Sequence, residues 1–204
     1  MNETLQNRVT PLGDIVAVSA RGTMMGNRGG RFHDDNQRLG RRRWASRAWI
    51  CCELHFKGWW RPVMGHGYTE LFFLDEVTAL AAGHRPCFEC RRADAKAFQA
   101  AFPGGPLRAG DMDRVLHAER LGKHQVACTV DLPDGAVWAV GGEAFARREG
   151  RVLRWSFEGW HEEPECQDSP ALLLTPPSIV GAFHSGYKPR WHISGAGSSD
   201  TATS

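Results

Sequence analysis

The sequence predicts an α+β protein: a small mixed sheet with short helices and a cysteine-bearing turn, followed by a C-terminal region rich in β-hairpins. Short runs of β-branched and aromatic residues, typical of strands, recur along the chain. Helix-capping residues lie between these runs in the first half, and turn sequences lie between them in the second half. The 204 residues, 42% hydrophobic and 24% charged, are typical of a globular chain rather than a disordered one or a coiled coil.

In the first half, the pattern of apolar and turn residues predicts strands and one loop. The strands are expected at residues 9–18, 47–56, 59–64 and 68–74. The first of these runs contains a turn at Leu12-Gly13-Asp14. Residues 21–43 are rich in Gly, Arg and Asn and show little apolar periodicity, so we expect a loop or an extended arm there.

Helices are predicted in the middle of the chain from capping residues and helix breakers. Asp75 can cap a helix over residues 76–82, and Gly83 would end it. A second helix is expected over residues 92–102, where Pro103-Gly104-Gly105 follows, and a third over residues 112–121.

The second half is predicted to consist of hairpins, one further strand and one helix. The hairpins are expected at residues 125–132 and 136–140 around Pro133-Asp134-Gly135, and at residues 143–148 and 151–157 around Glu149-Gly150. Residues 171–174 predict a strand, and Thr175 with the prolines that follow it predicts a helix that runs through His184.

These elements suggest three regions: residues 1–104, a β-rich part over residues 105–193, and a low-complexity, disordered tail over residues 194–204. The sequence has no apolar run of the ~18 residues that a membrane helix needs. The first eight residues are polar and do not resemble a secretory signal. We therefore expect a cytoplasmic protein without a membrane partner.

Positive charge is concentrated in the first third of the chain. The net charge of the whole chain is +2, whereas residues 21–61 carry nine Arg and one Lys against three acidic residues. Arginines alternate there with Trp44 and Trp49, as on surfaces that contact phosphates and stack on bases. The candidate nucleic-acid contacts are Arg38, Arg41, Arg42, Arg43 and Arg47. Alternatively, the aromatic residues pack one face of a sheet while the arginines lie in water.

The cysteines suggest a metal site. Six occur, at positions 51, 52, 87, 90, 128 and 166. In Cys87-Phe88-Glu89-Cys90, the two-residue spacing lets a tight turn direct both sulfurs to one tetrahedral zinc ion. Nearby Arg and His side chains favour the thiolate form that a metal binds. A redox pair and two unrelated packed cysteines remain alternatives for this motif.

Zinc needs further ligands, and Cys51 and Cys52 are the candidates. Adjacent residues of a strand point to opposite faces, so only one of the two can reach the metal unless the strand breaks. The fourth ligand would then be the other cysteine or one of the histidines His55, His66 and His84.

Residues 72–92, FFLDEVTALAAGHRPCFECRR, resemble the second half of the zinc-binding, phosphotriester-repair domain of Ada-type DNA alkylation-repair proteins. The resemblance implies a strand, a short Ala-rich helix and a turn in which Cys87 and Cys90 bind zinc. In that family four cysteines bind the metal, and the first also accepts a methyl group from a DNA phosphotriester. The family's leading cysteines are separated by three residues, whereas Cys51 and Cys52 are adjacent.

The sequence therefore leads to one hypothesis and two alternatives. The hypothesis is a zinc-binding protein that binds nucleic acid, most simply DNA, through its Arg/Trp-rich segment. The first alternative is an enzyme: a zinc-bound thiolate at Cys51 or Cys52 that accepts an alkyl group, or a zinc-dependent hydrolase acting on DNA. The second alternative is a metal-stabilised scaffold without catalysis.

Overall fold

The computed structural model describes residues 4–60, 62–122, 124–126, 129–164 and 171–195. These residues form two mixed or antiparallel sheets and several short helices, which confirms the predicted α+β class. Within the described part of the chain, no helix combines the length and the apolar character needed to cross a membrane.

The first sheet is built by the N-terminal strands and has the order β2-β1-β5-β3-β4-β6. Its strands are β1 (Gln6–Val9), β2 (Ile15–Ala17), β3 (Met24–Arg28), β4 (Trp49–Cys52), β5 (Leu71–Phe73) and β6 (Arg85–Pro86). The predicted strand at residues 9–18 is a hairpin whose turn lies at residues 10–14. The strand predicted at residues 59–64 is wrong, because none of its described residues forms a strand.

β3 lies inside the segment predicted to be a loop, so that prediction is wrong for residues 24–28. The strand lacks a strongly apolar sequence, but it pairs with β4 on one side and β5 on the other. Gly26 allows this pairing, since a Cβ atom at this position would lie 2.1 Å from the backbone oxygen of Ile50. Tertiary pairing therefore overrides the weak local strand signal.

The helices are α1 (Glu76–Ala81), α2 (Arg92–Ala101), α3 (Ala109–Leu121) and α4 (Pro177–His184), followed by a 3₁₀ turn η1 (Ile193–Gly195). The prediction that Asp75 caps α1 is confirmed, because its carboxylate accepts hydrogen bonds from the backbone N–H and the hydroxyl of Thr78. Thr175 does not cap α4: Pro176 occupies the cap position, and the Thr175 hydroxyl accepts a bond from the Val137 N–H.

The second sheet has the order β11-β10-β9-β8-β12-β7. Its strands are β7 (His124–Val126), β8 (Val137–Val140), β9 (Glu143–Arg148), β10 (Arg151–Trp155), β11 (Trp160–Glu163) and β12 (Ala171–Leu173). The hairpin around Glu149-Gly150 is confirmed as β9–β10. The hairpin around Pro133-Asp134-Gly135 is wrong, because β12 lies between β7 and β8 and pairs with both.

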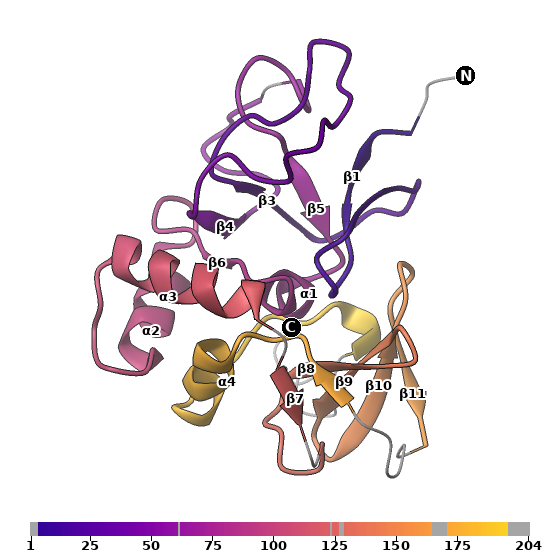
Figure 1. Cartoon of the computed structure of the whole chain (residues 1–204), viewed down its shortest axis with the longest axis vertical. Helices are drawn as coiled ribbons and strands as arrows, with labels where there is room; N and C mark the ends of the chain where they lie inside the picture. Colours follow the sequence, from indigo (N-terminus) through magenta and orange to yellow (C-terminus); the bar gives the residue numbers. More distant parts are fainter. Residues whose placement is uncertain (1–3, 61, 123, 127–128, 165–170, 196–204) are drawn as a thin grey trace.

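α1 lies between the two sheets and contributes to the core on both sides (Figure 1). Ala79 and Ala82 pack with the buried face of the first sheet. Val77 and Ala81 pack with Val137, Leu153 and Trp160 of the second sheet. The cores of the predicted regions 1–104 and 105–193 are thus continuous, and the division at residue 104 stays a prediction from sequence. Ser194 and Gly195, the start of the predicted tail, lie in η1, and residues 196–204 lie outside the described residues.

Candidate metal centre

Pairing between β4 and β6 brings the two cysteine motifs together. The strands run parallel, with Ile50 opposite Arg85 and Cys51 opposite Pro86. The backbone N–H of Cys87 continues this pairing by donating to the Cys51 carbonyl at 3.0 Å. Cys87 therefore lies beside Cys52, and the turn through residues 88 and 89 returns Cys90 to the same place.

The Sγ atoms of Cys52, Cys87 and Cys90 lie within 4.8 Å of one another. We call these three residues the thiol cluster. A zinc ion with ~2.3 Å bonds to tetrahedral sulfurs needs them about 3.8 Å apart, so small side-chain adjustments would let this cluster hold one. Cys87 is buried, and Cys52 and Cys90 are half-buried. Three converging soft donors fit zinc in type and position and supply three of its four ligands.

Hydrogen bonds within the cluster favour the thiolate form of Cys87. Bonds from the Cys52 and Cys90 thiols lower the pKa of Cys87, and the Glu89 N–H donates to its sulfur at 3.4 Å. The hydrogen bonds that the Cys52 thiol makes to Cys87 and to Cys90 raise the pKa of Cys52, because they are made by its protonated form. A divalent cation bound by these three sulfurs would replace the hydrogen bonds between them and release their protons.

Cys51 lies outside the thiol cluster, as the alternation of a strand requires. Its side chain is fully buried on the opposite face of β4, where Nη1 of Arg91 donates to Sγ at 3.6 Å. Burial raises the pKa of this thiol. Cys51 is therefore part of the core, and Cys52 is the member of the pair that reaches the predicted site.

The predicted histidine ligands do not join the cluster. His84 is completely buried between Trp49 and Phe73, and its Nδ1 lies 3.2 Å from the Ala79 carbonyl. His55 and His66 are exposed in the connection between β4 and β5. Among the described residues, no fourth His, Cys, Asp or Glu belongs to the cluster. Cys128 and Cys166 lie outside the described residues.

The sheet face that carries the thiol cluster also carries a pocket. Cross-strand pairing places Arg8, Phe72, Met25 and Cys52 in one row over four adjacent strands. Phe72 and Arg8 line a pocket of about 430 Å³ at the far end of this row. At ~4.8 Å per strand, Phe72 lies about 10 Å from Cys52.

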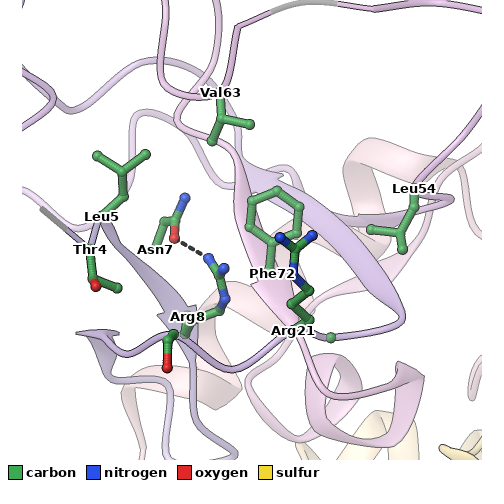
Figure 2. A pocket seen from close by; sticks show the side chains of 10 residues that line it. Thr4, Leu5, Asn7, Arg8, Arg21, Leu54, Val63 and Phe72 are labelled. Atoms are coloured by element: carbon green, nitrogen blue, oxygen red, sulfur yellow. Dashed lines mark hydrogen bonds between the residues drawn. The ribbon is translucent and has the colours of Figure 1, made fainter. Parts of the chain in front are cut away.

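Two arginines and several apolar side chains surround this pocket (Figure 2). Arg8 lies over the ring of Phe72, 4.9 Å from its centroid, and donates a hydrogen bond to the amide oxygen of Asn7. Arg21 follows β2, and Leu54 and Val63 come from the connection between β4 and β5. This pocket could not be predicted from the sequence, because its residues come from segments that are far apart along the chain.

The predicted nucleic-acid residues are on the surface. Arg38, Arg41, Arg42 and Arg47 are exposed, and Arg43 is half-buried. They lie in the connection between β3 and β4, which extends from the first sheet beside the connection between β4 and β5 (Figure 1). Hydrogen bonds join these two connections: Gln37 donates to the Val63 carbonyl at 2.8 Å, and Thr69 donates to the Gly30 carbonyl at 3.2 Å.

The tryptophans of this region divide into two groups. Trp59 and Trp60 are 64% and 85% exposed in the connection after β4. Trp49 is buried, so it fits the alternative reading in which an aromatic residue packs a sheet face. Trp44 is 38% exposed and packs against Trp49, with the ring centroids 6.0 Å apart. The exposed pair, rather than Trp49, offers faces on which a base could stack.

Comparison with known proteins gave no match: no protein-family model, no curated protein and no solved structure is similar to this chain.

Proposed function

We propose that this protein binds one zinc ion through Cys52, Cys87 and Cys90 and binds nucleic acid through the adjacent surface. The observation that carries the proposal is the thiol cluster, in which Cys52 lies beside Cys87, 35 residues later in the sequence, and beside Cys90. A bound zinc would link the end of β4 to the turn before α2. This link would fix the connection that carries Trp59 and Trp60.

The arrangement of the surface supports the nucleic-acid part of the proposal. The exposed arginines supply charge without fixed acidic partners, because no ion pair between described residues involves Arg38, Arg41, Arg42 or Arg47. The exposed tryptophans supply stacking surfaces on the neighbouring connection. Phosphate contact and base stacking are the two interactions that single-stranded nucleic acids require. Single-stranded DNA is therefore the first ligand to test.

Replacement of Arg38, Arg41, Arg42 and Arg47 by Gln is expected to remove most binding of a fluorescent DNA oligonucleotide. If all four contact phosphates, the logarithm of the binding constant falls with the logarithm of salt concentration with a slope of about −3. Fluorescence anisotropy at several salt concentrations measures this slope. The quadruple variant should have a slope near zero.

The matched control is Arg114→Gln, which removes an exposed arginine of α3 far along the chain from the proposed surface. This control should bind like the wild type. Replacing Trp59 and Trp60 by Ala should weaken binding at all salt concentrations without changing the slope. Failure of the zinc-loaded wild type to bind DNA or RNA at low salt would remove the nucleic-acid part of the proposal.

A second candidate function is a catalytic metal centre. Two observations favour it. The pocket lies on the same face of the sheet as the thiol cluster, and among the described residues the cluster offers three ligands, the number found in catalytic zinc sites. Zinc with three protein ligands supplies an activated water when it is bound. Arg8 and Arg21 would bind an anionic group of the substrate at the other end of the row. Cobalt substitution tests this role, because an added anion changes the absorption bands of an open site and not those of a closed one.

Alkyl transfer is the other catalytic version. In this reaction the Cys52 sulfur would form a bond to the methyl carbon of a phosphotriester, and the carbon–oxygen bond would break to leave a phosphodiester. Cys52 is the suitable thiol because it is half-buried, whereas Cys51 is enclosed by the core. Mass spectrometry after exposure to methylated DNA would show an added methyl group on Cys52. An unmodified Cys52 rules this version out.

A further inference from the structure

A second cavity, of about 350 Å³, lies between the two sheets and contains no cysteine. It is formed by the β1–β2 turn at Gly13, by Arg28 and Trp49 at the ends of paired strands β3 and β4, by Arg120 of α3 and by Leu172 of β12. Trp49 and Cys51 share the buried face of β4, so the cavity lies on the side of the sheet away from the thiol cluster. It is therefore separate from the site of the proposed function.

Arg28 is the most deeply buried charge in this cavity. The residue is 2% exposed, and its guanidinium lies 4.0 Å from the centroid of the Trp49 ring. One nitrogen, Nη2, donates to the Gly13 carbonyl at 2.9 Å. Nε is buried and has no hydrogen-bond partner among the described residues. A buried guanidinium that is satisfied by one neutral carbonyl is costly unless something else compensates its charge.

Arg120 repeats this arrangement from α3. Its guanidinium also lies over Trp49, at 4.1 Å, and donates to the carbonyls of Gly83 and Arg47. Its Nε is again buried and without a partner within the described part of the chain. Arg43, half-buried at the cavity, donates to the carbonyls of Gly40 and Arg42. None of these three arginines takes part in an ion pair between described residues.

Three carboxylates lie near these arginines. Asp14 attracts the charge of Arg28 and opposes the lowering of its pKa, whereas Glu119 and Asp113 are engaged elsewhere. Glu119 accepts hydrogen bonds from the backbone N–H and the hydroxyl of Ser178. Asp113 forms a bidentate pair with Arg85, with distances of 2.8 and 2.9 Å. Burial and the neighbouring Arg120 lower the pKa of Arg28 to about 9, and burial lowers that of Arg120 to about 10. The cavity thus holds an excess of positive charge that a bound anion would balance.

We propose that this cavity binds a small organic phosphate, with the phosphate held by Arg28, Arg43 and Arg120. Planar guanidinium groups bind phosphate through pairs of parallel hydrogen bonds, and a dianion balances more of this charge than one carboxylate does. Trp44 and Leu172 supply an apolar wall for the rest of the ligand. The volume is within the range of small-molecule sites and is too small for a nucleic-acid chain.

The test uses the full-length, zinc-loaded protein and three probes: inorganic phosphate, AMP and adenosine. Isothermal titration calorimetry should show that AMP binds and that inorganic phosphate competes with it. Adenosine, which lacks the phosphate, should bind at least tenfold more weakly than AMP. The variants Arg28→Met and Arg120→Met should each weaken AMP binding at least tenfold, whereas Arg114→Gln, an exposed position of α3 outside the cavity, should not change it.

The proposal is wrong if neither AMP nor inorganic phosphate binds at concentrations up to about 10 mM, a generous limit for a specific site. It is also wrong if AMP and adenosine bind equally well, or if AMP binding is unchanged in both methionine variants. Since Arg28 is buried, circular dichroism must first show that its variant is folded. If the variant is unfolded, Arg120→Met alone decides the result. Loss of DNA binding with AMP binding retained would remove the proposed function and leave this site intact.

Discussion

At the scale of single residues, the candidate site depends on the alternation of side chains along β4. Cys51 and Cys52 are neighbours in sequence, but their thiols lie on opposite faces of one strand. Cys51 contacts Arg91 inside the core, and Cys52 faces Cys87 and Cys90. One residue of register therefore decides which thiol can bind a metal.

Replacing Cys52 by Ala is expected to abolish stable zinc binding, because two thiols hold the ion much less tightly than three. Cys51→Ala is the matched control and should retain one zinc per chain. Zinc content after dialysis against a competing chelator measures the difference. Equal loss of zinc in both variants, or loss in Cys51→Ala alone, would show that the thiol cluster has been assigned to the wrong cysteine.

His84 gives a prediction about acid stability. Burial, together with the charges of Arg28 and Arg120, lowers the pKa of His84 well below its ordinary value of 6.5. The unfolded chain therefore binds a proton at pH 5.5 that the folded chain does not bind, and the protein loses stability as the pH falls through 6.5. Between pH 7.5 and 5.5 this loss is about 1.4 kcal/mol.

The variant His84→Phe keeps a ring between Trp49 and Phe73 and cannot bind a proton. Between pH 7.5 and 5.5, the free energy of unfolding of this variant, measured in urea, should fall by about 1.4 kcal/mol less than that of the wild type. The same pH dependence in variant and wild type would mean that His84 titrates normally in the folded protein.

At the scale of elements, β3 holds the first sheet together even though its sequence is not typical of a strand. It connects β5, which carries Phe72 of the first pocket, to β4, which carries Cys52. Gly26 lies at the centre of the strand, opposite Cys51 on one side and Leu71 on the other. The absence of a side chain at this point lets the backbones of β3 and β4 approach.

The variant Gly26→Ala is expected to destabilise the protein by several kcal/mol, because the new Cβ would overlap the Ile50 backbone oxygen. Gly110→Ala in α3 is the matched control. A Cβ at Gly110 meets open space, so this change should stabilise the helix by up to about 1 kcal/mol. Thermal unfolding of both variants tests the pair, and an unchanged melting temperature for Gly26→Ala would contradict the close approach of the strands.

The elements that the sequence predicted correctly have strong local signals. Asp75 caps α1 through bonds to the residue three positions later, and Glu149-Gly150 closes a hairpin between strands that are adjacent in sequence. The elements that it did not predict depend on distant partners. β3 is a strand because β4 and β5 pair with it. A strand was predicted at β7, but its partner was not, since β7 pairs with β12 across more than forty residues of sequence.

At the scale of the whole molecule, a buried polar network connects the two halves. Arg91 pairs with Glu76 at 2.7 Å, and Tyr187, beyond the second sheet in sequence, donates to the same carboxylate at 2.6 Å. The backbone N–H of Arg190 also donates to Glu76. Arg91 contacts Cys51 as well, so this network borders the strand that carries Cys52. The network therefore joins the strand that carries Cys52 to the C-terminal segment that follows α4.

Glu76→Gln is expected to lower the free energy of unfolding by about 1.5–3 kcal/mol, because it removes the fully buried carboxylate that pairs with Arg91, while Asp94 stays paired with Arg91 at 2.8 Å. The exposed pair of Lys57 and Glu89 provides the control, since Lys57→Ala should cost less than about 1 kcal/mol. Urea unfolding followed by fluorescence and by circular dichroism should give one shared transition in both variants. Two separate transitions would contradict the continuous core.

The site was predictable from sequence in part. The spacing of Cys87 and Cys90 indicates a metal-binding turn, and strand alternation shows that only one of Cys51 and Cys52 can join it. The choice of Cys52 needs the pairing of β4 with β6, and a two-residue strand such as β6 gives no sequence signal. The cavity around Arg28 was not predictable either, because its walls come from both sheets and depend on how the sheets pack together.

X-ray absorption at the zinc edge of the purified full-length protein tests the central claim most directly. The account predicts one zinc per chain with three sulfur neighbours at about 2.3 Å, and a loss of this signal in Cys52→Ala. A folded protein that takes up no zinc, or a bound zinc surrounded by nitrogen and oxygen alone, would contradict it.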